Sequence, residues 1–207
     1  TGGYSGISAL ATSGNSLSIT TTGTVRGDSN FGIVLRDQRN SAPKGMITVD
    51  AGSVVQGQQA AIVIANSNAA GTDILVNGRV ENNSGATSDL AIRVTTLAAG
   101  GGATVSNAGG TITGTLQLTA ADDVFNNVGS WLTAGGTSDF GGGNDLLNNT
   151  ATGLIDVADV AGTAELTTFN GLEQFTNAGR VSLQDGGVDD RLVTTGNYTG
   201  AGGTLLI

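Results

Sequence analysis

One short sequence unit recurs along the whole chain and constrains its fold more than any other feature. The unit is an apolar stretch, a turn that contains glycine and a second apolar stretch, as in Ile47–Gly57. The turn glycines recur at an average spacing of about 25 residues, within the range typical of repeat architectures. They are Gly23, Gly52, Gly78, Gly109, Gly129, Gly153, Gly179 and Gly196. The chain is therefore predicted to be a solenoid.

Three rows of aliphatic residues advance together through the first half of the chain. The rows are Ile7, Ile33, Ile62 and Ile92; Ile19, Ile47, Ile74 and Val105; and Val25, Val54, Val80 and Ile112. β-Branched residues at alternate positions favour strands, and equivalent residues would stack about 4.8 Å apart in successive coils. This pattern predicts a right-handed parallel β-helix of about eight coils, with three short strands per coil.

The pattern changes after Leu116–Leu118, where aromatic residues enter and the coils become shorter. We expect a single β-helix domain over residues 1–207, with regular coils in 1–114 and shorter coils in 115–207. Acidic pairs now precede strands, at Asp122-Asp123, Asn144-Asp145 and Asp189-Asp190. Asp and Asn side chains bond to nearby backbone amides in tight turns, so these pairs are expected to mark one stacked corner.

Composition excludes several functional classes. A net charge of −9 with eight Lys and Arg argues against nucleic acid or an anionic membrane as a partner. The absence of Cys and His excludes disulfides, Ser-His-Asp catalysis and His-based zinc sites. No apolar run approaches the roughly 18 residues of a transmembrane helix. We expect no cofactor.

Four segments resemble the passenger domains of autotransporters, the type V secretion proteins of Gram-negative bacteria. They are Asp122–Asn127, Phe140–Asn149, Phe169–Gly179 and Gly196–Ile207. The resemblance covers the whole chain but is specific only in residues 115–207. It implies the C-terminal part of a β-helical passenger, exported to the cell surface and followed, in the missing C-terminal part of the polypeptide, by an outer-membrane barrel. We therefore expect a fragment of a longer passenger, and zero Cys with one Pro agrees with export in an unfolded state.

Arg26-Gly27-Asp28 is the candidate binding motif. On an exposed turn it would present a cation and a carboxylate, and the carboxylate could complete a metal site in an integrin. Some autotransporter adhesins carry this tripeptide, so the resemblance supports attachment to a host-cell receptor or to extracellular matrix. The alternative is that Gly27 and Asp28 only close their coil, as Gly57 and Gly114 close theirs.

Gly141–Leu146 resembles one copy of the calcium-binding nonapeptide repeat. That site takes its oxygen ligands from at least two consecutive copies, and the next glycine cluster, Gly186-Gly187, lacks the spacing. A glycine-rich corner is the favoured interpretation, and no metal is expected.

A carbohydrate-active enzyme is the alternative function. Its acidic groove would use Asp122, Asp123, Asp145, Asp189 and Asp190, provided that their corners align. The chain has a single Lys, no His and only 4% aromatic residues, so we expect no enzyme.

The sequence thus favours a rigid stalk and adhesin scaffold at the cell surface. The expected partner is a host receptor, the matrix, or the same protein on a neighbouring cell. A self-associating protein that promotes aggregation or biofilm formation is a further alternative.

Overall fold

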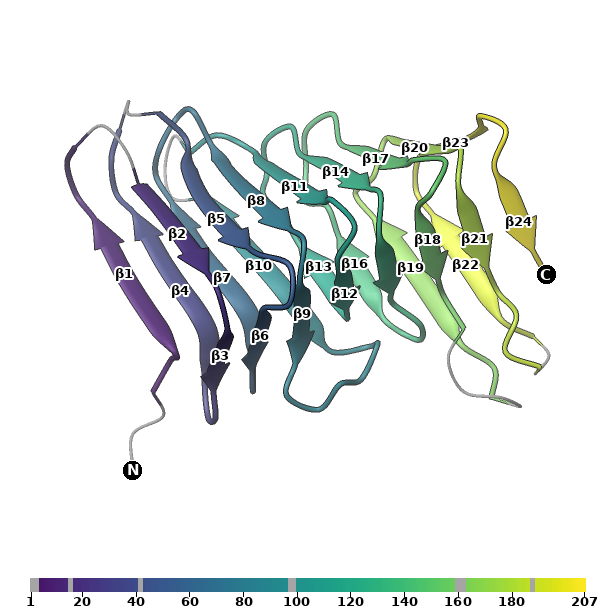
Figure 1. Cartoon of the computed structure of the whole chain (residues 1–207). Coiled ribbons are helices and arrows are strands. Elements are labelled where there is room, and N and C mark those ends of the chain that lie inside the picture. The colour runs from purple at the N-terminus through teal and green to yellow at the C-terminus, as the bar shows by residue number, and fades with distance from the viewer. Residues whose placement is uncertain (1–3, 15–16, 41–42, 97–99, 159–162, 187–188) are drawn as a thin grey trace.

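The part of the chain that the structure describes folds into three parallel β-sheets of eight strands each. The computed structural model describes residues 4–14, 17–40, 43–96, 100–158, 163–186 and 189–207, and these ranges contain no helix. Consecutive strands enter different sheets, and every third strand returns to the same sheet one level further along (Figure 1). This is the predicted right-handed parallel β-helix, with three strands per coil.

Each sheet contains one strand from every coil. The first sheet contains β1 (Ile7–Ala11), β4 (Phe31–Asp37), β7 (Ala60–Asn66), β10 (Leu90–Thr96), β13 (Thr115–Gln117), β16 (Thr137–Asp139), β19 (Leu166–Asn170) and β22 (Arg191–Thr194). The second contains β2 (Leu17–Thr21), β5 (Gly45–Val49), β8 (Thr72–Val76), β11 (Ala103–Asn107), β14 (Val124–Asn127), β17 (Leu146–Asn149), β20 (Gln174–Asn177) and β23 (Asn197–Gly200). The third contains β3 (Thr24–Gly27), β6 (Val54–Gly57), β9 (Arg79–Asn82), β12 (Thr111–Thr113), β15 (Ser130–Leu132), β18 (Leu154–Asp156), β21 (Arg180–Ser182) and β24 (Thr204–Leu206).

Two of the three predicted aliphatic rows are confirmed residue by residue. In the first sheet, Ile33 is paired with Ile7 on one side and with Ile62 on the other. In the second sheet, Ile47 lies in the same way between its neighbours Ile19 and Ile74. These side chains point into the tube, where burial of aliphatic surface stabilises each coil against the next.

The third row is wrong at one position. Val25 is paired with Val55, not with Val54, and Val55 is in turn paired with Val80. Val55 is fully buried, whereas Val54 lies one residue earlier on the outer face of β6. Because side chains alternate along a strand, a shift by one residue moves a side chain to the other face of the sheet.

Aromatic residues fill the tube in the later coils. Phe125 and Phe175 continue the row that begins with Ile19, and Trp131 continues the row of Val25. The Trp131 ring stacks on Phe169 with centroids 4.9 Å apart and meets Phe125 edge-on at 5.0 Å. The Trp131 indole Nε1–H donates to the carbonyl of Gly114 at 2.9 Å, so its one polar atom is satisfied in the core.

Seven of the eight predicted turn glycines occupy one corner, between the second and third sheets. Gly196 is the exception, because it lies between β22 and β23 and so belongs to the corner between the first and second sheets. In the last coil, the corner that leads into the third sheet contains Gly202 and Gly203. Gly196 therefore lies in a turn, but it does not continue the series formed by the other seven glycines.

Most of these positions require glycine because adjacent coils stack closely there, and fewer require it because of unusual backbone angles. Only Gly52 and Gly109 of the eight have positive φ, at 80° and 111°. At Gly179 a Cβ atom would collide with the carbonyl oxygen of Thr150 in the preceding coil. Gly23, in the first coil, has open space around the position of a Cβ.

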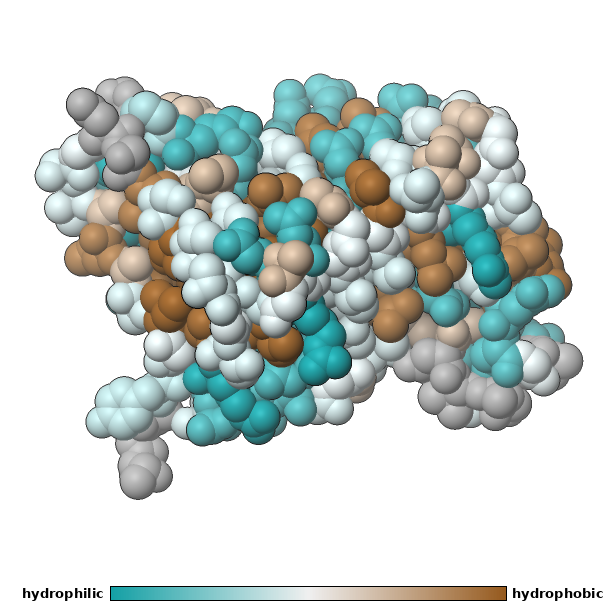
Figure 2. Space-filling model, in the orientation of Figure 1, coloured by the Kyte–Doolittle hydropathy of each residue, from teal (hydrophilic) through white to brown (hydrophobic). Residues whose placement is uncertain are grey.

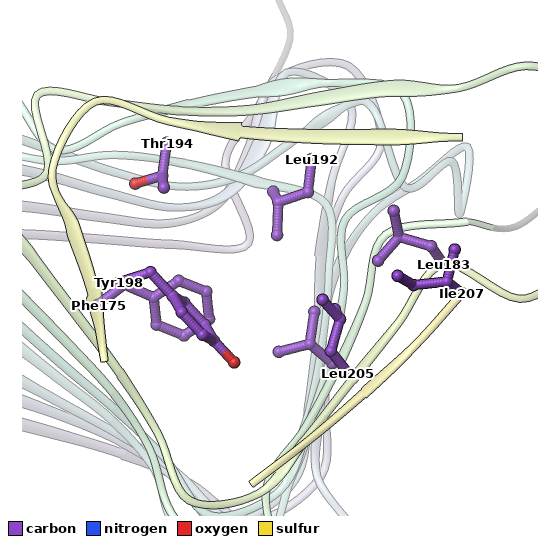
Figure 3. Close-up of a pocket in the computed structure, with 8 residues that line it drawn as sticks. Phe175, Leu183, Leu192, Thr194, Tyr198, Leu205 and Ile207 are labelled. Carbon is purple, nitrogen blue, oxygen red and sulfur yellow. The ribbon is translucent and has the colours of Figure 1, made fainter. Parts of the chain in front are cut away.

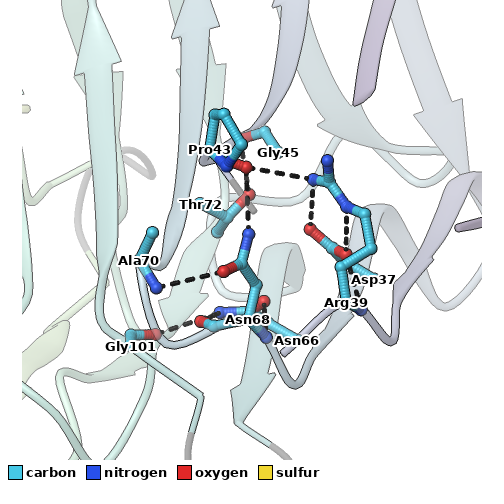
Figure 4. A network of polar contacts seen from close by, with 9 residues as sticks. All are labelled: Asp37, Arg39, Pro43, Gly45, Asn66, Asn68, Ala70, Thr72 and Gly101. Atoms are coloured by element: carbon cyan, nitrogen blue, oxygen red, sulfur yellow. Dashed lines mark hydrogen bonds and ion pairs between the residues drawn. The ribbon is translucent and has the colours of Figure 1, made fainter. Parts of the chain in front are cut away.

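The loop after β4 leaves the tube at the corner between the first and second sheets and is held by a buried ion pair (Figure 4). Arg39 donates from Nε and Nη2 to the two carboxylate oxygens of Asp37, at 2.8 and 2.7 Å. Burial favours the neutral acid, but the hydrogen bonds from Arg39 outweigh it, so the pKa of Asp37 lies below its ordinary value. The carbonyl of Pro43 accepts from both Arg39 and Asn68, which ties the loop to the next coil.

Candidate functional site

The Arg26-Gly27-Asp28 motif lies at the end of β3, at the corner that leads into the first sheet. The side chains of Arg26 and Asp28 are 53% and 82% exposed. They pair with each other, since Arg26 Nε donates to Asp28 Oδ1 at 2.6 Å. An ion pair this exposed contributes at most about 1 kcal/mol, so a partner that binds either group could separate them at little cost.

Gly27 itself has a structural role in the coil. It is in register with Gly57, and at both positions a Cβ would collide with the backbone carbonyl oxygen of the first residue of the next strand, Phe31 or Ala60. The Gly27 carbonyl accepts from the backbone N–H of Gln58 at 3.1 Å and from the Asn83 side chain at 2.9 Å. The glycine closes the coil and also holds the two charged side chains on a fixed corner.

Acidic side chains from three adjacent coils lie just before the strands of the second sheet, and we call this row the acidic ladder. Asp123 and Asp145 are in equivalent positions of adjacent coils, each one residue before its strand, and Glu173 occupies the same position one coil further on. Asp145 Oδ1 accepts the backbone N–H of Asp123 at 2.7 Å, and Glu173 Oε2 accepts that of Asp145 at 2.8 Å. Each carboxylate therefore links its coil to the preceding one.

The environment of this ladder changes the acidity of two of its members. Burial raises the pKa of Asp123, although hydrogen bonds from Ala103 and Thr119 partly offset it. Burial also raises the pKa of Asp145 to about 7, and the neighbouring charges of Asp123 and Glu173 act in the same direction. Asp145 Oδ2 is buried and has no hydrogen-bond partner. This corner therefore carries a carboxyl group that titrates near neutral pH.

The proposed acidic groove is only partly assembled. Asp122, Asp123 and Asp145 share the corner, but Asp189 and Asp190 precede β22 and lie at the corner that enters the first sheet. The expectation that all the acidic pairs mark one stacked corner was therefore wrong. Asp123 is fully buried and both its oxygens accept hydrogen bonds, so it does not face a polysaccharide.

Asp190 has acidic neighbours of its own. Glu165, Asp185 and Asp190 each place one carboxylate oxygen within 4.8 Å of the others, and Asp190 Oδ1 accepts the backbone N–H of Glu165 at 3.0 Å. Glu165 is buried and Asp185 and Asp190 are partly buried, but no sequence motif for a metal accompanies this group.

The glycine-rich segment before Leu146 forms a corner. Gly141 and Gly143 have φ of 89° and 123°, and the Asn144 N–H donates to Asp122 Oδ1 at 2.8 Å. Asp145, which would be the acidic ligand of a calcium repeat, accepts a backbone N–H instead. The geometry matches the interpretation as a corner.

A row of buried asparagine side chains, one at the end of each of four successive strands in the second sheet, was not predicted. We call this row the asparagine ladder. Asn107 donates to the side-chain oxygen of Asn127, Asn127 to Asn149 and Asn149 to Asn177, at 2.8, 2.9 and 2.7 Å. The ladder ends where Asn177 donates to the Tyr198 hydroxyl at 3.0 Å. The sequence does carry a signal for it, because each of these four residues stands two positions after a buried apolar residue, as in Val105-Ser106-Asn107.

The apolar interior is open at the C-terminal end of the tube (Figure 3). A cavity of about 260 Å³ is lined there by Phe175, Val181, Leu183, Leu192, Thr194, Tyr198, Leu205 and Ile207. Apart from Thr194 and the Tyr198 hydroxyl, its walls are hydrocarbon.

Comparisons with protein-family models, with curated proteins and with solved structures found no match. In the parts of the chain that the structure describes, no helix is long and apolar enough to cross a lipid bilayer.

Proposed function

We propose that this chain is a rigid β-helical segment of a surface protein of the autotransporter passenger type, which holds exposed corners away from the cell for attachment. The observation that carries the proposal is the continuity of the three sheets. Each runs through all eight coils without changing partners, so the backbone forms one rod (Figure 1).

In this proposal the interior and the corners have different roles. The buried rows and the two polar ladders stabilise the rod, and neither ladder requires a ligand to do so. The corners vary from coil to coil, and such surface loops on a rigid scaffold are where binding residues usually occur. Arg26 and Asp28 lie on one of these corners with both side chains exposed.

Composition supports the export part of the proposal. The chain has no Cys and one Pro, so neither disulfides nor many slow proline isomerisations would hinder passage in an unfolded state. Parallel pairing between coils is non-local, and folding dominated by such contacts is slow, which would leave time for transport.

The surface location can be tested on intact bacterial cells that make the protein. Protease added outside should remove the segment while a periplasmic marker protein stays intact. Full protection of the segment until the cells are lysed would reject the surface location.

Attachment can be tested with the purified chain coated on beads. We expect the beads to bind integrin-bearing cells, and Asp28→Glu to reduce that binding because the longer side chain misplaces the carboxylate. Asp73→Glu is the matched control, since Asp73 is an exposed acid paired with Lys44 at 2.8 Å and lies elsewhere on the surface. Equal binding by both variants would reject the motif, and no binding by the unmodified chain would reject attachment through integrins.

A further inference from the structure

An Asn-Gly pair, Asn170-Gly171, lies at the end of β19 in the seventh coil. The sequence contains one other such pair, Asn77-Gly78, which follows β8 in the third coil. Because glycine has no side chain, its backbone nitrogen can approach the side-chain carbonyl carbon of the preceding asparagine closely. Both pairs lie inside the column of coils, so they can be compared within one fold.

The surroundings of the two pairs differ. The Gly78 N–H donates to the carbonyl of Val49 at 3.1 Å, and Asn77 is only partly exposed. The Gly171 N–H has no acceptor among the described residues, and Asn170 is exposed as the last residue of its strand. The backbone nitrogen is therefore held by the preceding coil in one pair and available in the other.

The fold requires the glycine at position 171. Its φ is 68°, and a Cβ there would collide with the carbonyl oxygen of Gly141 in the preceding coil. The Asn170 side chain is less constrained, since its Nδ2 donates to Asp139 Oδ1 at 3.2 Å on the surface. An exposed hydrogen bond of this length contributes little to stability, so the amide can leave it at low cost.

We propose that Asn170 is a site of spontaneous modification in the folded protein, where it deamidates through a cyclic imide formed with Gly171. The Gly171 backbone nitrogen attacks Cγ of Asn170, and a new C–N bond closes a five-membered ring. The bond from Cγ to Nδ2 breaks, and the nitrogen leaves as ammonia with the proton that Gly171 loses. The inference does not depend on the proposed function.

Water completes the reaction by opening the ring. Attack at one carbonyl carbon gives aspartate, and attack at the other gives isoaspartate, in which the main chain runs through the side-chain carbon. The net change consumes one water and releases one ammonia, with no oxidation or reduction. Asn170 belongs to the corner between the first and second sheets, at the upper edge of the molecule, and Figure 2 shows hydrophilic residues along much of that edge.

The modification would change the contact between the sixth and seventh coils. Asp139 and Asn170 are register partners, and the amide of Asn170 is a donor to Asp139. The product places a carboxylate beside that of Asp139, so a hydrogen bond is replaced by repulsion between like charges. Both groups are exposed, so salt should screen the repulsion.

Peptide mapping by mass spectrometry tests the proposal on the unmodified chain, incubated for several weeks at physiological pH and temperature. Cleavage after glutamate releases Leu166–Glu173, which contains Asn170, and trypsin releases Gly45–Arg79, which contains Asn77. In the folded chain we expect Asn170 to deamidate several-fold faster than Asn77. The chain unfolded in urea is the control, and there the two pairs should react at similar rates.

Two variants test the chemistry and its consequence. Asn170→Gln keeps the amide but would need a larger ring, so Leu166–Glu173 should keep its mass. Asn170→Asp reproduces one product and should lower the urea midpoint at low salt, by an amount that shrinks as salt is added.

Three results would overturn the proposal. One is an Asn170 that stays intact in the folded chain while it reacts in urea. Another is deamidation of Asn77 at an equal or higher rate in the folded chain. The third is an Asn170→Asp variant with the midpoint of the original chain at low salt, which would show that the new carboxylate does not act on Asp139.

Discussion

Asp145 lies one coil beyond Asp123, and its carboxylate accepts the backbone N–H of Asp123 at 2.7 Å. The bond joins two coils at a buried corner, yet it places two carboxylates in the same low-dielectric environment. Burial and this neighbouring charge together raise the pKa of Asp145 to about 7. The corner is therefore stabilised by hydrogen bonding and destabilised by ionisation.

Stability should fall as the pH rises through this range. The folded chain retains the Asp145 proton up to a pKa of about 7, whereas the unfolded chain releases it near the ordinary value of 3.8. Between these values the folded state binds more protons, so the free energy of unfolding falls with rising pH, by up to about 4 kcal/mol. Asp145→Asn should remove this dependence and make the chain more stable than the original at neutral pH. The free energy of unfolding of both chains can be measured at each pH by urea unfolding, followed by the fluorescence of Trp131, the one tryptophan.

Asp28→Asn is the control for this experiment, because Asp28 is exposed at another corner and its charge does not act on Asp145. It should keep the pH dependence of the original chain. A dependence that persists unchanged in Asp145→Asn would show that Asp145 does not titrate in this range.

The asparagine ladder should make a large contribution to stability. Asn149→Ala would leave the side-chain oxygen of Asn177 and the carbonyl of Arg180 without their donor, at a buried site. Unsatisfied buried polar groups cost about 1–3 kcal/mol each, so we expect a loss of roughly 2–5 kcal/mol in the free energy of unfolding. Asn148→Ala, on the outer face of the same strand, should cost less than about 1 kcal/mol. Equal losses in the two variants would contradict the ladder.

Glycines at one corner should differ in their tolerance of a side chain. Gly179→Ala would force a Cβ into the carbonyl oxygen of Thr150, so the coils must separate locally, and we expect a loss of several kcal/mol. Gly23→Ala meets open space at ordinary backbone angles and should be neutral or stabilising by roughly 0.4–1 kcal/mol. Thermal denaturation of the two variants compares them, and a tolerated Gly179→Ala would mean that the corners stack less closely.

The corrected register of the third sheet makes a similar comparison possible. Val55 is fully buried and Val54 is not, although the two are adjacent and identical in type. Val55→Asp would bury an unpaired charge and should prevent stable folding, while Val54→Asp should leave the fold intact. Circular dichroism distinguishes the outcomes, and the reverse pattern would restore the register first expected from the sequence.

The repeat was enough to predict the fold, because an apolar row can be followed by its period alone. It could not fix the register where two β-branched residues are adjacent, as at Val54 and Val55, since both fit an alternating pattern. Gly196 was counted in the same series as the other turn glycines for a related reason: the last coil has glycines at two corners, and spacing alone does not distinguish them.

The polar ladders were harder to predict than the rows. Glu173 joins Asp123 and Asp145 only in three dimensions, because in the sequence it follows Leu172 and not another polar residue. The Asp189-Asp190 pair also precedes a strand, but that strand, β22, belongs to the first sheet and not to the second. Pairing of Arg26 with Asp28 likewise depends on the side-chain conformations at a corner, which no periodicity determines.

In-register stacking along the whole column is the claim on which the rod and its exposed corners depend. The chain has no cysteine, so introduced pairs can be oxidised without competition. Outward-facing register partners should lie about 4.8 Å apart, within the range that a disulfide spans, whereas partners displaced by two residues exceed it.

Cysteine pairs at Ser18 with Met46, Asn126 with Asn148, and Thr176 with Thr199 sample the first, middle and last coils. We predict that all three crosslink on mild oxidation. The displaced pairs Ser18 with Thr48, Asn126 with Leu146, and Thr176 with Asn197 should not. If the register pair and the displaced pair crosslink equally in the first, middle or last coils, the result would contradict a single in-register column.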